Sequence, residues 1–330
     1  MIIFTPSKIY EQFLQNLLDK RTTTELLKAI IDNSDEESLR VSALIHFAKL
    51  GLRDSFFEIL EQLVISDSNQ TIRLFAIDLI REKFLHKAFP LINWAIQHEN
   101  SYPCQVSLIK TLKEIQDDDV KHSLINYLHQ LSNESNQMKI GDSYSMLKYN
   151  RVIKQLLLKE LFNLTQNQLA DILLNYLTIL ELSFSYQYLS YEINEELGVV
   201  IELNLSDLEL ETKGLPFGWK YNIESIEEIT GMINLTHLIK LDLSNNNIRT
   251  IKDLMQMKQI KELNLSNNKL SNEIEIEYLN NICSLQLIDL HDNSIAEKVT
   301  KSYFKPKVKV ILKTYLQELE ERFEQRMFQN

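Results

Sequence analysis

The chain has 330 residues, of which 44% are hydrophobic and 25% charged, a composition typical of a folded, soluble protein. Its net charge of −11 argues against a general attraction to nucleic acid or to anionic lipid. Six glycines occur, and none of them stands in the spacing of a loop that cradles phosphate, which excludes the usual nucleotide-binding motifs.

The cysteines and the N-terminus indicate a protein of a reducing compartment. Cys104 and Cys283 lie far apart in the sequence, so we expect neither a disulfide framework nor a thiolate zinc site. The opening stretch MIIFTP is too short for the core of a signal peptide, and no run of eighteen uncharged apolar residues follows. These features predict a cytoplasmic protein that does not span a membrane.

The first part of the chain contains three related segments. Arg40, Arg73 and Gln105 occupy matching positions, at steps of 33 and 32 residues. Each is surrounded by apolar residues at helical spacing, and each segment is followed by a second amphipathic stretch, which predicts a pair of helices per repeat. Asp35 and Asp67 precede two of these helices and are predicted to cap them.

A helix pair of this length cannot bury its apolar side alone, so successive pairs are expected to stack into an α-solenoid. The acidic turn, the arginine in the first helix and the alanine- and leucine-rich stripe resemble short HEAT-type repeats, which also occur in proteins similar to phycobilin lyases. The resemblance covers roughly residues 22–131, and Gln105 departs from it. It implies the fold and not the lyase activity. Two further helical stretches after a polar loop at 132–145 are expected to continue the stack.

The second part of the chain repeats the frame L-x-x-L-x-L-x-x-N. Copies start at Leu238, Ile260 and Leu285, and a degenerate copy starts at Val200. This frame resembles the leucine-rich repeat family, in its short type of 22 residues. The resemblance implies short parallel strands with leucines facing inward. Residues 209–222 interrupt the period.

The asparagines of this frame are interpreted as structural. Asn246, Asn268 and Asn293 fall at the repeat's asparagine position, where a buried side-chain amide satisfies backbone groups of the turn. The neighbouring asparagines suit a left-handed backbone.

Residues 298–330 leave the frame. Pro306 suits a helix start, and an apolar stripe follows it, formed by Ile311, Leu312, Tyr315, Leu316, Leu319 and Phe323. We interpret this segment as a helix that caps the last repeat, with a membrane or dimerisation helix as the alternative. Six lysines between 298 and 313 form a basic patch, which suits a solvated rim.

The predicted fold class is therefore an α+β repeat protein: a HEAT-like α-solenoid at 1–195, leucine-rich repeats at 196–297 and a C-terminal cap helix at 298–330. The sequence contains no histidine pair or cysteine at zinc spacing and no G-x-S-x-G or cysteine-centred nucleophile motif. We expect no metal, no cofactor and no catalytic residue, and hence no enzyme.

The exposed side of the predicted strands is the candidate binding surface. In the strand frame its residues form three columns, which are Glu202, Lys240, Glu262 and Leu287, then Asn204, Asp242, Asn264 and Asp289, then Ser206, Ser244, Ser266 and His291. The partner-binding residues are predicted to be Glu202, Asn204, Lys240, Asp242, Glu262, Asn264, Leu287, Asp289 and His291. The acids among them favour a partner with basic groups.

These observations predict a noncatalytic protein-binding scaffold or adaptor that is monomeric. The alternative is a regulatory or substrate-selecting subunit of an enzyme complex, because helical and leucine-rich combinations resemble prenyltransferase and phosphatase subunits. No prenyltransferase repeat motif is visible. Nucleic-acid binding along the helices, as in HEAT-like DNA glycosylases, needs a basic groove, whereas residues 1–195 carry more acids than bases.

Overall fold

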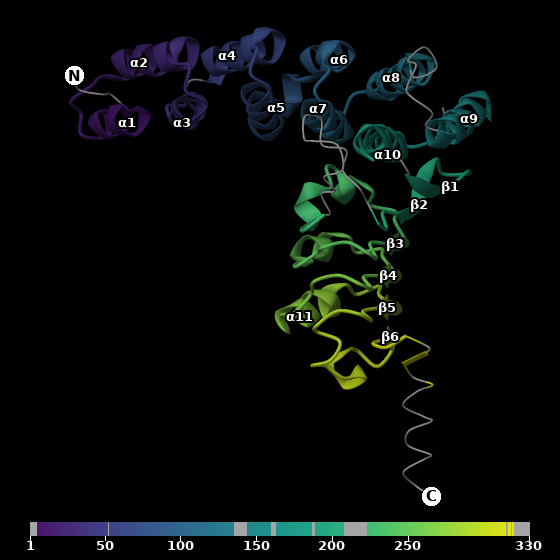
Figure 1. Cartoon of the computed structure of the whole chain (residues 1–330). Coiled ribbons are helices and arrows are strands. Elements are labelled where there is room, and N and C mark those ends of the chain that lie inside the picture. Colours follow the sequence, from purple (N-terminus) through teal and green to yellow (C-terminus); the bar gives the residue numbers. More distant parts are fainter. Residues whose placement is uncertain are drawn as a thin grey trace, which may run out of the picture. The chain divides into compact units, whose positions relative to one another are not determined.

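The computed structural model describes residues 5–51, 53–134, 144–159, 163–186, 189–207 and 223–314, together with 316, 317 and 319. The chain forms two compact units, Met1–Tyr127 and Leu128–Asn330. The first is helical, and the second contains helices followed by a sheet (Figure 1). The division lies within a helix and differs from the boundary at 195 drawn from the sequence, so the predicted domain boundaries stay a prediction.

The first unit consists of short helices joined by tight turns. They are α1 (Pro6–Leu14), α2 (Lys20–Asn33), α3 (Glu37–Ala48), α4 (Arg53–Ser66), α5 (Gln70–Phe84), the 3-10 turn η1 (Leu85–Lys87), α6 (Phe89–His98), α7 (Tyr102–Glu114) and the first part of α8 (Val120–Glu134). Helix α2 contacts α1 and α3, α4 contacts α5, and α6 contacts α7; α5 also contacts α3 and α7. The prediction of a helical N-terminal region is confirmed.

The two arginines at the aligned positions tie these helix pairs together. Arg40 in α3 donates to both carboxylate oxygens of Asp67, in the turn before α5, and to the Ile31 carbonyl at 2.7 Å. Arg73, one repeat later in α5, donates to the two carboxylate oxygens of Glu99 at 2.8 and 2.9 Å. At the third position Gln105 donates to the Glu99 carbonyl at 2.8 Å. The repeated position therefore anchors successive turns.

These ion pairs also correct the predicted helix caps. Asp67 does not cap α5, because its carboxylate pairs with Arg40, and Asn69 accepts from the first backbone N–H groups instead. Glu36, and not Asp35, occupies the cap position of α3. Burial alone would raise the pKa of Glu99, but the hydrogen bonds from Arg73 and from the backbone outweigh it and lower that pKa.

The second unit begins with the end of α8 and continues with two long helices and a six-stranded sheet. Its elements are α9 (Tyr144–Lys159), α10 (Gln166–Ser185), β1 (Ser190–Asn194), β2 (Val199–Asn204), η3 (Ile226–Glu228), η4 (Met232–Asn234), β3 (Lys240–Asp242), η5 (Lys252–Gln256), β4 (Glu262–Asn264), α11 (Ile274–Asn281), β5 (Leu287–Asp289), η6 (Lys301–Tyr303) and β6 (Lys309–Ile311). The strands follow chain order; β1 is antiparallel to β2, and all later pairs are parallel.

The leucine frame gives the sheet its buried side. Leu203, Leu241, Leu263 and Ile288 are paired in register across β2 to β5, and all four are buried. Because side chains alternate along a strand, the residues before and after each of them point to the opposite side. The expectation of short parallel strands with inward leucines is confirmed for β3, β4 and β5.

Sequence reasoning missed β1 and β6. Strand β6 lies inside the segment predicted to be the cap helix and pairs with β5 through Val310 opposite Ile288. Residues 306–314 are not helical, so a helix start at Pro306 is wrong. Val310 instead extends the buried side of the sheet, while Ile311 lines the opposite side. Within the predicted cap segment, Tyr315, Glu318 and residues 320–330 lie outside the described residues.

The helices α9 and α10 cover the β1–β2 end of the sheet. Asn175 of α10 accepts from the backbone N–H of Val200 at 3.0 Å, and Tyr149 of α9 donates to the carbonyl of Gly198 at 2.8 Å. Gly198 has a left-handed φ of 67°, and a Cβ there would lie 2.6 Å from the Leu156 side chain. Burial raises the pKa of Tyr149 well above its ordinary value, so this hydroxyl remains a hydrogen-bond donor.

A buried carboxylate joins α11 to the connection between β3 and η5, one repeat earlier. Glu275 is buried, and its Oε2 accepts from the backbone N–H of Ile251 at 2.9 Å and from the Thr250 hydroxyl at 3.4 Å. Burial raises the pKa of Glu275, although these hydrogen bonds oppose the shift. The connection between β3 and β4 is therefore held by a charged group in an apolar setting.

Candidate functional site

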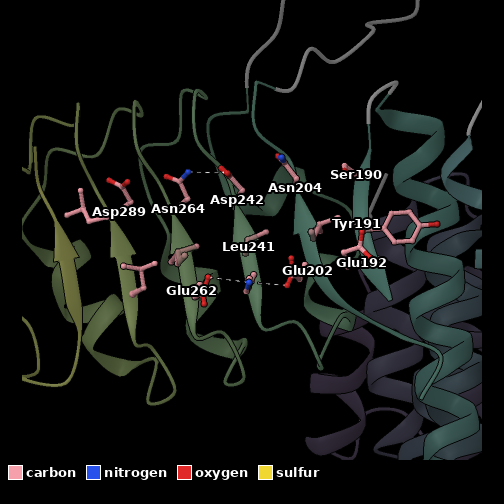
Figure 2. A pocket seen from close by; sticks show the side chains of 15 residues that line it. Ser190, Tyr191, Glu192, Glu202, Asn204, Leu241, Asp242, Glu262, Asn264 and Asp289 are labelled. Atoms are coloured by element: carbon pink, nitrogen blue, oxygen red, sulfur yellow. Dashed lines mark hydrogen bonds and ion pairs between the residues drawn. The ribbon is translucent and has the colours of Figure 1, made fainter. Parts of the chain in front are cut away.

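The side of the sheet opposite the leucines forms an open hollow across β1 to β6 (Figure 2). The register places Glu202, Lys240, Glu262 and Leu287 next to one another, and it does the same for Asn204, Asp242, Asn264 and Asp289. We call these sets the first row and the second row. All eight predicted residues line the hollow, whereas His291 does not.

The first row is held together by an exposed ammonium group. The Nζ of Lys240 lies 3.2 Å from a carboxylate oxygen of Glu202 and 3.6 Å from one of Glu262. The hydrogen bond that Lys240 donates to Glu202 and the charges of both carboxylates raise the pKa of Lys240. Ion pairs as exposed as these contribute little to stability, so their charges can be redirected to a binding partner.

The second row supports the ends of the strands. Asp242 accepts from the backbone N–H and the hydroxyl of Ser244 at 2.9 and 2.7 Å, and Asn264 accepts from Ser266 in the same way at 3.1 and 2.8 Å. Asn264 also donates to Asp242 at 3.1 Å, the upper dashed line in Figure 2. These side chains have a structural task in addition to any contact with a partner.

The third predicted column is wrong for two of its members. Ser244 and Ser266 are only 5% and 6% exposed, because their hydroxyls turn back to the side chain two residues earlier instead of facing solvent. Ser206 is half-buried. His291 is half-buried as well, and its Nδ1 lies 2.6 Å from a carboxylate oxygen of Asp289.

Residues of β1 that sequence reasoning missed complete the hollow. Ser190 and Glu192 are exposed on its surface, and Glu192 lies opposite Glu202 in the antiparallel pair. The alternation of exposed and apolar residues in SYEIN is the period-two signal that could have revealed this strand. With Glu192, the lining residues carry five carboxylates and one ammonium, a formal charge of −4.

The remaining chemistry of the described residues is sparse. No group of three His, Cys, Asp or Glu side chains among them could hold a metal ion. Cys104 is buried, and burial raises the pKa of its thiol, while Cys283 is exposed. Within the described ranges, no helix combines the length and the apolar character that crossing a bilayer requires.

Comparison with known proteins identifies the repeat in part of the sheet. A family model described as leucine rich repeat matches residues 222–270, the stretch that contains β3, β4, Asn246 and Asn268. No curated protein sequence matches the chain. Domains of this repeat generally mediate interactions between proteins.

Proposed function

We propose that this protein is a noncatalytic scaffold or adaptor that binds a protein partner on the exposed side of its sheet. The observation that carries the proposal is the alignment of the first and second rows in one acidic hollow. The contact residues are Glu202, Asn204, Lys240, Asp242, Glu262, Asn264, Leu287 and Asp289, with His291 at the margin.

Rigidity favours this surface as a binding site. The strands are paired in register, and the second row is fixed by hydrogen bonds, so little conformational entropy remains to be lost on binding. A formal charge of −4 in an open hollow attracts a basic surface and accelerates its encounter. The partner is therefore a protein with clustered lysine or arginine side chains.

The helical unit is proposed to be a HEAT-like solenoid that offers a second binding surface. Support comes from the repeated anchoring of turns by Arg40 and Arg73 at a constant step. The proposal includes a monomeric protein in the cytoplasm, in keeping with two unpaired cysteines, one of them exposed.

Matched double variants test the acidic hollow. Glu202→Gln with Glu262→Gln removes two charges from the first row, while Glu227→Gln with Asp253→Asn removes two from the connections η3 and η5, outside the hollow. The three proteins are immobilised, and captured proteins from a native lysate are quantified at two salt concentrations.

We expect the first-row variant to capture less of a partner that binds in the hollow, and the control variant to capture as much of it as the parent does. High salt should weaken its binding to the parent. Equal capture by all three proteins would show that the hollow is not the recognition surface. Because both pairs change the net charge equally, nonspecific attraction to an acidic protein cannot produce the expected difference.

A further inference from the structure

The acidic hollow does not end at the edge of the sheet. A second hollow adjoins β1 and shares Ser190, Tyr191 and Glu192 with the first. Its other wall is α9, which contributes Leu147, Lys148 and Arg151. A partner segment that crosses the strands can therefore continue past β1 and contact the helix.

The charge changes sign along this path. Lys148 pairs with Glu192 at 2.6 Å, so the two charges offset each other at the junction. Arg151 is exposed, and no carboxylate among the described residues pairs with it. Leu147, 61% exposed, adds an apolar surface beside it. A guanidinium without a partner at the end of an acidic hollow favours an anionic group at one end of the ligand.

From this arrangement we infer that the partner segment is extended and bipolar, with basic side chains over β2 to β5 and an acidic group beside Arg151. The inference rests on the proposed function and adds the charge order of the partner. A second copy of this chain fits less well. If the β1 strands of two copies paired antiparallel about their central residue, Glu192 of one copy would lie opposite Glu192 of the other, and the two like charges would repel each other.

The spacing of the strands gives the length of the segment. Neighbouring strands lie about 4.8 Å apart, so the three steps from β2 to β5 span about 14 Å. An extended chain advances about 3.3 Å per residue and crosses this width in about five residues. The acidic group should therefore lie within a few positions of one end of a basic block of about five residues.

Synthetic peptides of defined charge order test the inference directly. One probe carries five arginines, two glycines and two glutamates, and a second carries the same residues in reverse order. Each has a companion in which glutamine replaces glutamate. Fluorescence anisotropy at low ionic strength gives their affinities for the parent, for Arg151→Gln and for Lys154→Gln, which removes another exposed cation of α9 outside the hollow.

For one of the two chain directions, replacing glutamate should weaken binding to the parent by about two- to fivefold, the range of an exposed ion pair. Arg151→Gln should abolish this difference, and Lys154→Gln should preserve it. If the difference persists in Arg151→Gln, or is absent for both directions, the inference is overturned. Concentration-dependent dimers of the parent that Arg151→Gln abolishes would also overturn it, in favour of a second copy.

The first-row variant separates this result from the proposed function. If Glu202→Gln with Glu262→Gln weakens peptide binding more than Glu227→Gln with Asp253→Asn does, the acidic hollow binds the arginines whatever the outcome at Arg151. If the two double variants bind alike, or no peptide binds, the proposed function fails together with the inference.

Discussion

The asparagine ladder gives the most direct test of the fold, through Asn268→Ala. The Asn268 side chain is 3% exposed. Its Nδ2 donates to the carbonyls of Leu243, Leu265 and Ser266 at 2.9, 3.1 and 3.2 Å, and its Oδ1 accepts from the backbone N–H of Ile248 at 3.0 Å. Leu243 and Ile248 belong to the preceding repeat. One amide therefore joins two turns of the backbone.

Alanine would leave the buried N–H of Ile248 without its acceptor, at a cost of about 1–3 kcal/mol, and the carbonyls would lose a donor as well. We therefore expect a loss in the upper part of that range, about 2–3 kcal/mol. Asn268→Asp keeps the shape and the acceptor but sets a carboxylate against three carbonyl oxygens. It should destabilise more than alanine at pH 7, and protonation should relieve part of the loss.

Hydrogen exchange across residues 240–270 and urea unfolding measure this effect, and the exchange data report on the repeat itself. The matched control is Asn267→Gly. Asn267 is exposed and has a left-handed φ of 52°, which glycine adopts without strain, so we expect a change within about 0.5 kcal/mol. Unchanged exchange in Asn268→Ala, or a milder effect of aspartate than of alanine at pH 7, would refute the role assigned to the amide.

Three further predictions concern stability, each measured by urea unfolding. Gly198→Ala should cost more than the roughly 1–2 kcal/mol of its left-handed backbone alone, because the new Cβ meets a side chain, whereas Gly51→Ala, with open space around it, should cost only that amount. Glu275→Gln should stabilise the protein at pH 7, because burial raises the pKa of this carboxyl and its ionisation opposes folding; the gain should disappear as the pH falls below the ordinary value of 4.5. Arg73→Ala should cost about 1.5–3 kcal/mol by leaving a half-buried carboxylate without its partner, whereas Arg21→Ala, at a fully exposed ion pair, should cost little.

The strand repeats could be predicted because the sequence has two periodicities, one within each strand and one between repeats. Leucines alternate within each strand, and the whole frame recurs, so Leu241, Leu263 and Ile288 define both the buried side and the register. The same periodicity predicts that the first and second rows lie next to each other. The repeat pattern could therefore predict the residues of the site that lie on the repeated strands, which are the first and second rows.

The ends of the sheet could not be derived in this way. Strand β1 is antiparallel, and no other described strand of the chain shares its motif, while β6 lies in a lysine-rich stretch whose apolar residues also suit a helix. Helical periodicity and strand alternation are difficult to separate over so few residues. Sequence reasoning therefore missed Ser190 and Glu192 of the hollow, and with them the connection to α9.

Local hydrogen bonding was the second source of error. From sequence alone, a serine after a strand is predicted to be exposed. In the fold, however, the hydroxyls of Ser244 and Ser266 are buried and donate hydrogen bonds to Asp242 and Asn264. Asp67 reads as a helix cap, yet an arginine 27 positions earlier in the chain binds it. Such choices between solvent, backbone and a distant partner depend on the assembled fold and not on the residue type.

The two rows of the hollow therefore differ in what a substitution can reveal. Replacing Asp242 removes the acceptor of two hydrogen bonds from Ser244, so a loss of binding in that variant would mix recognition with a change at the end of β3. Among the described residues, Glu202 and Glu262 form ion pairs with the exposed ammonium of Lys240 alone, and glutamine at both positions keeps their size. Substitutions in the first row can thus reveal a partner that binds there while the strand ends stay intact. Charge reversal in the second row cannot separate a loss of recognition from a change at the strand ends.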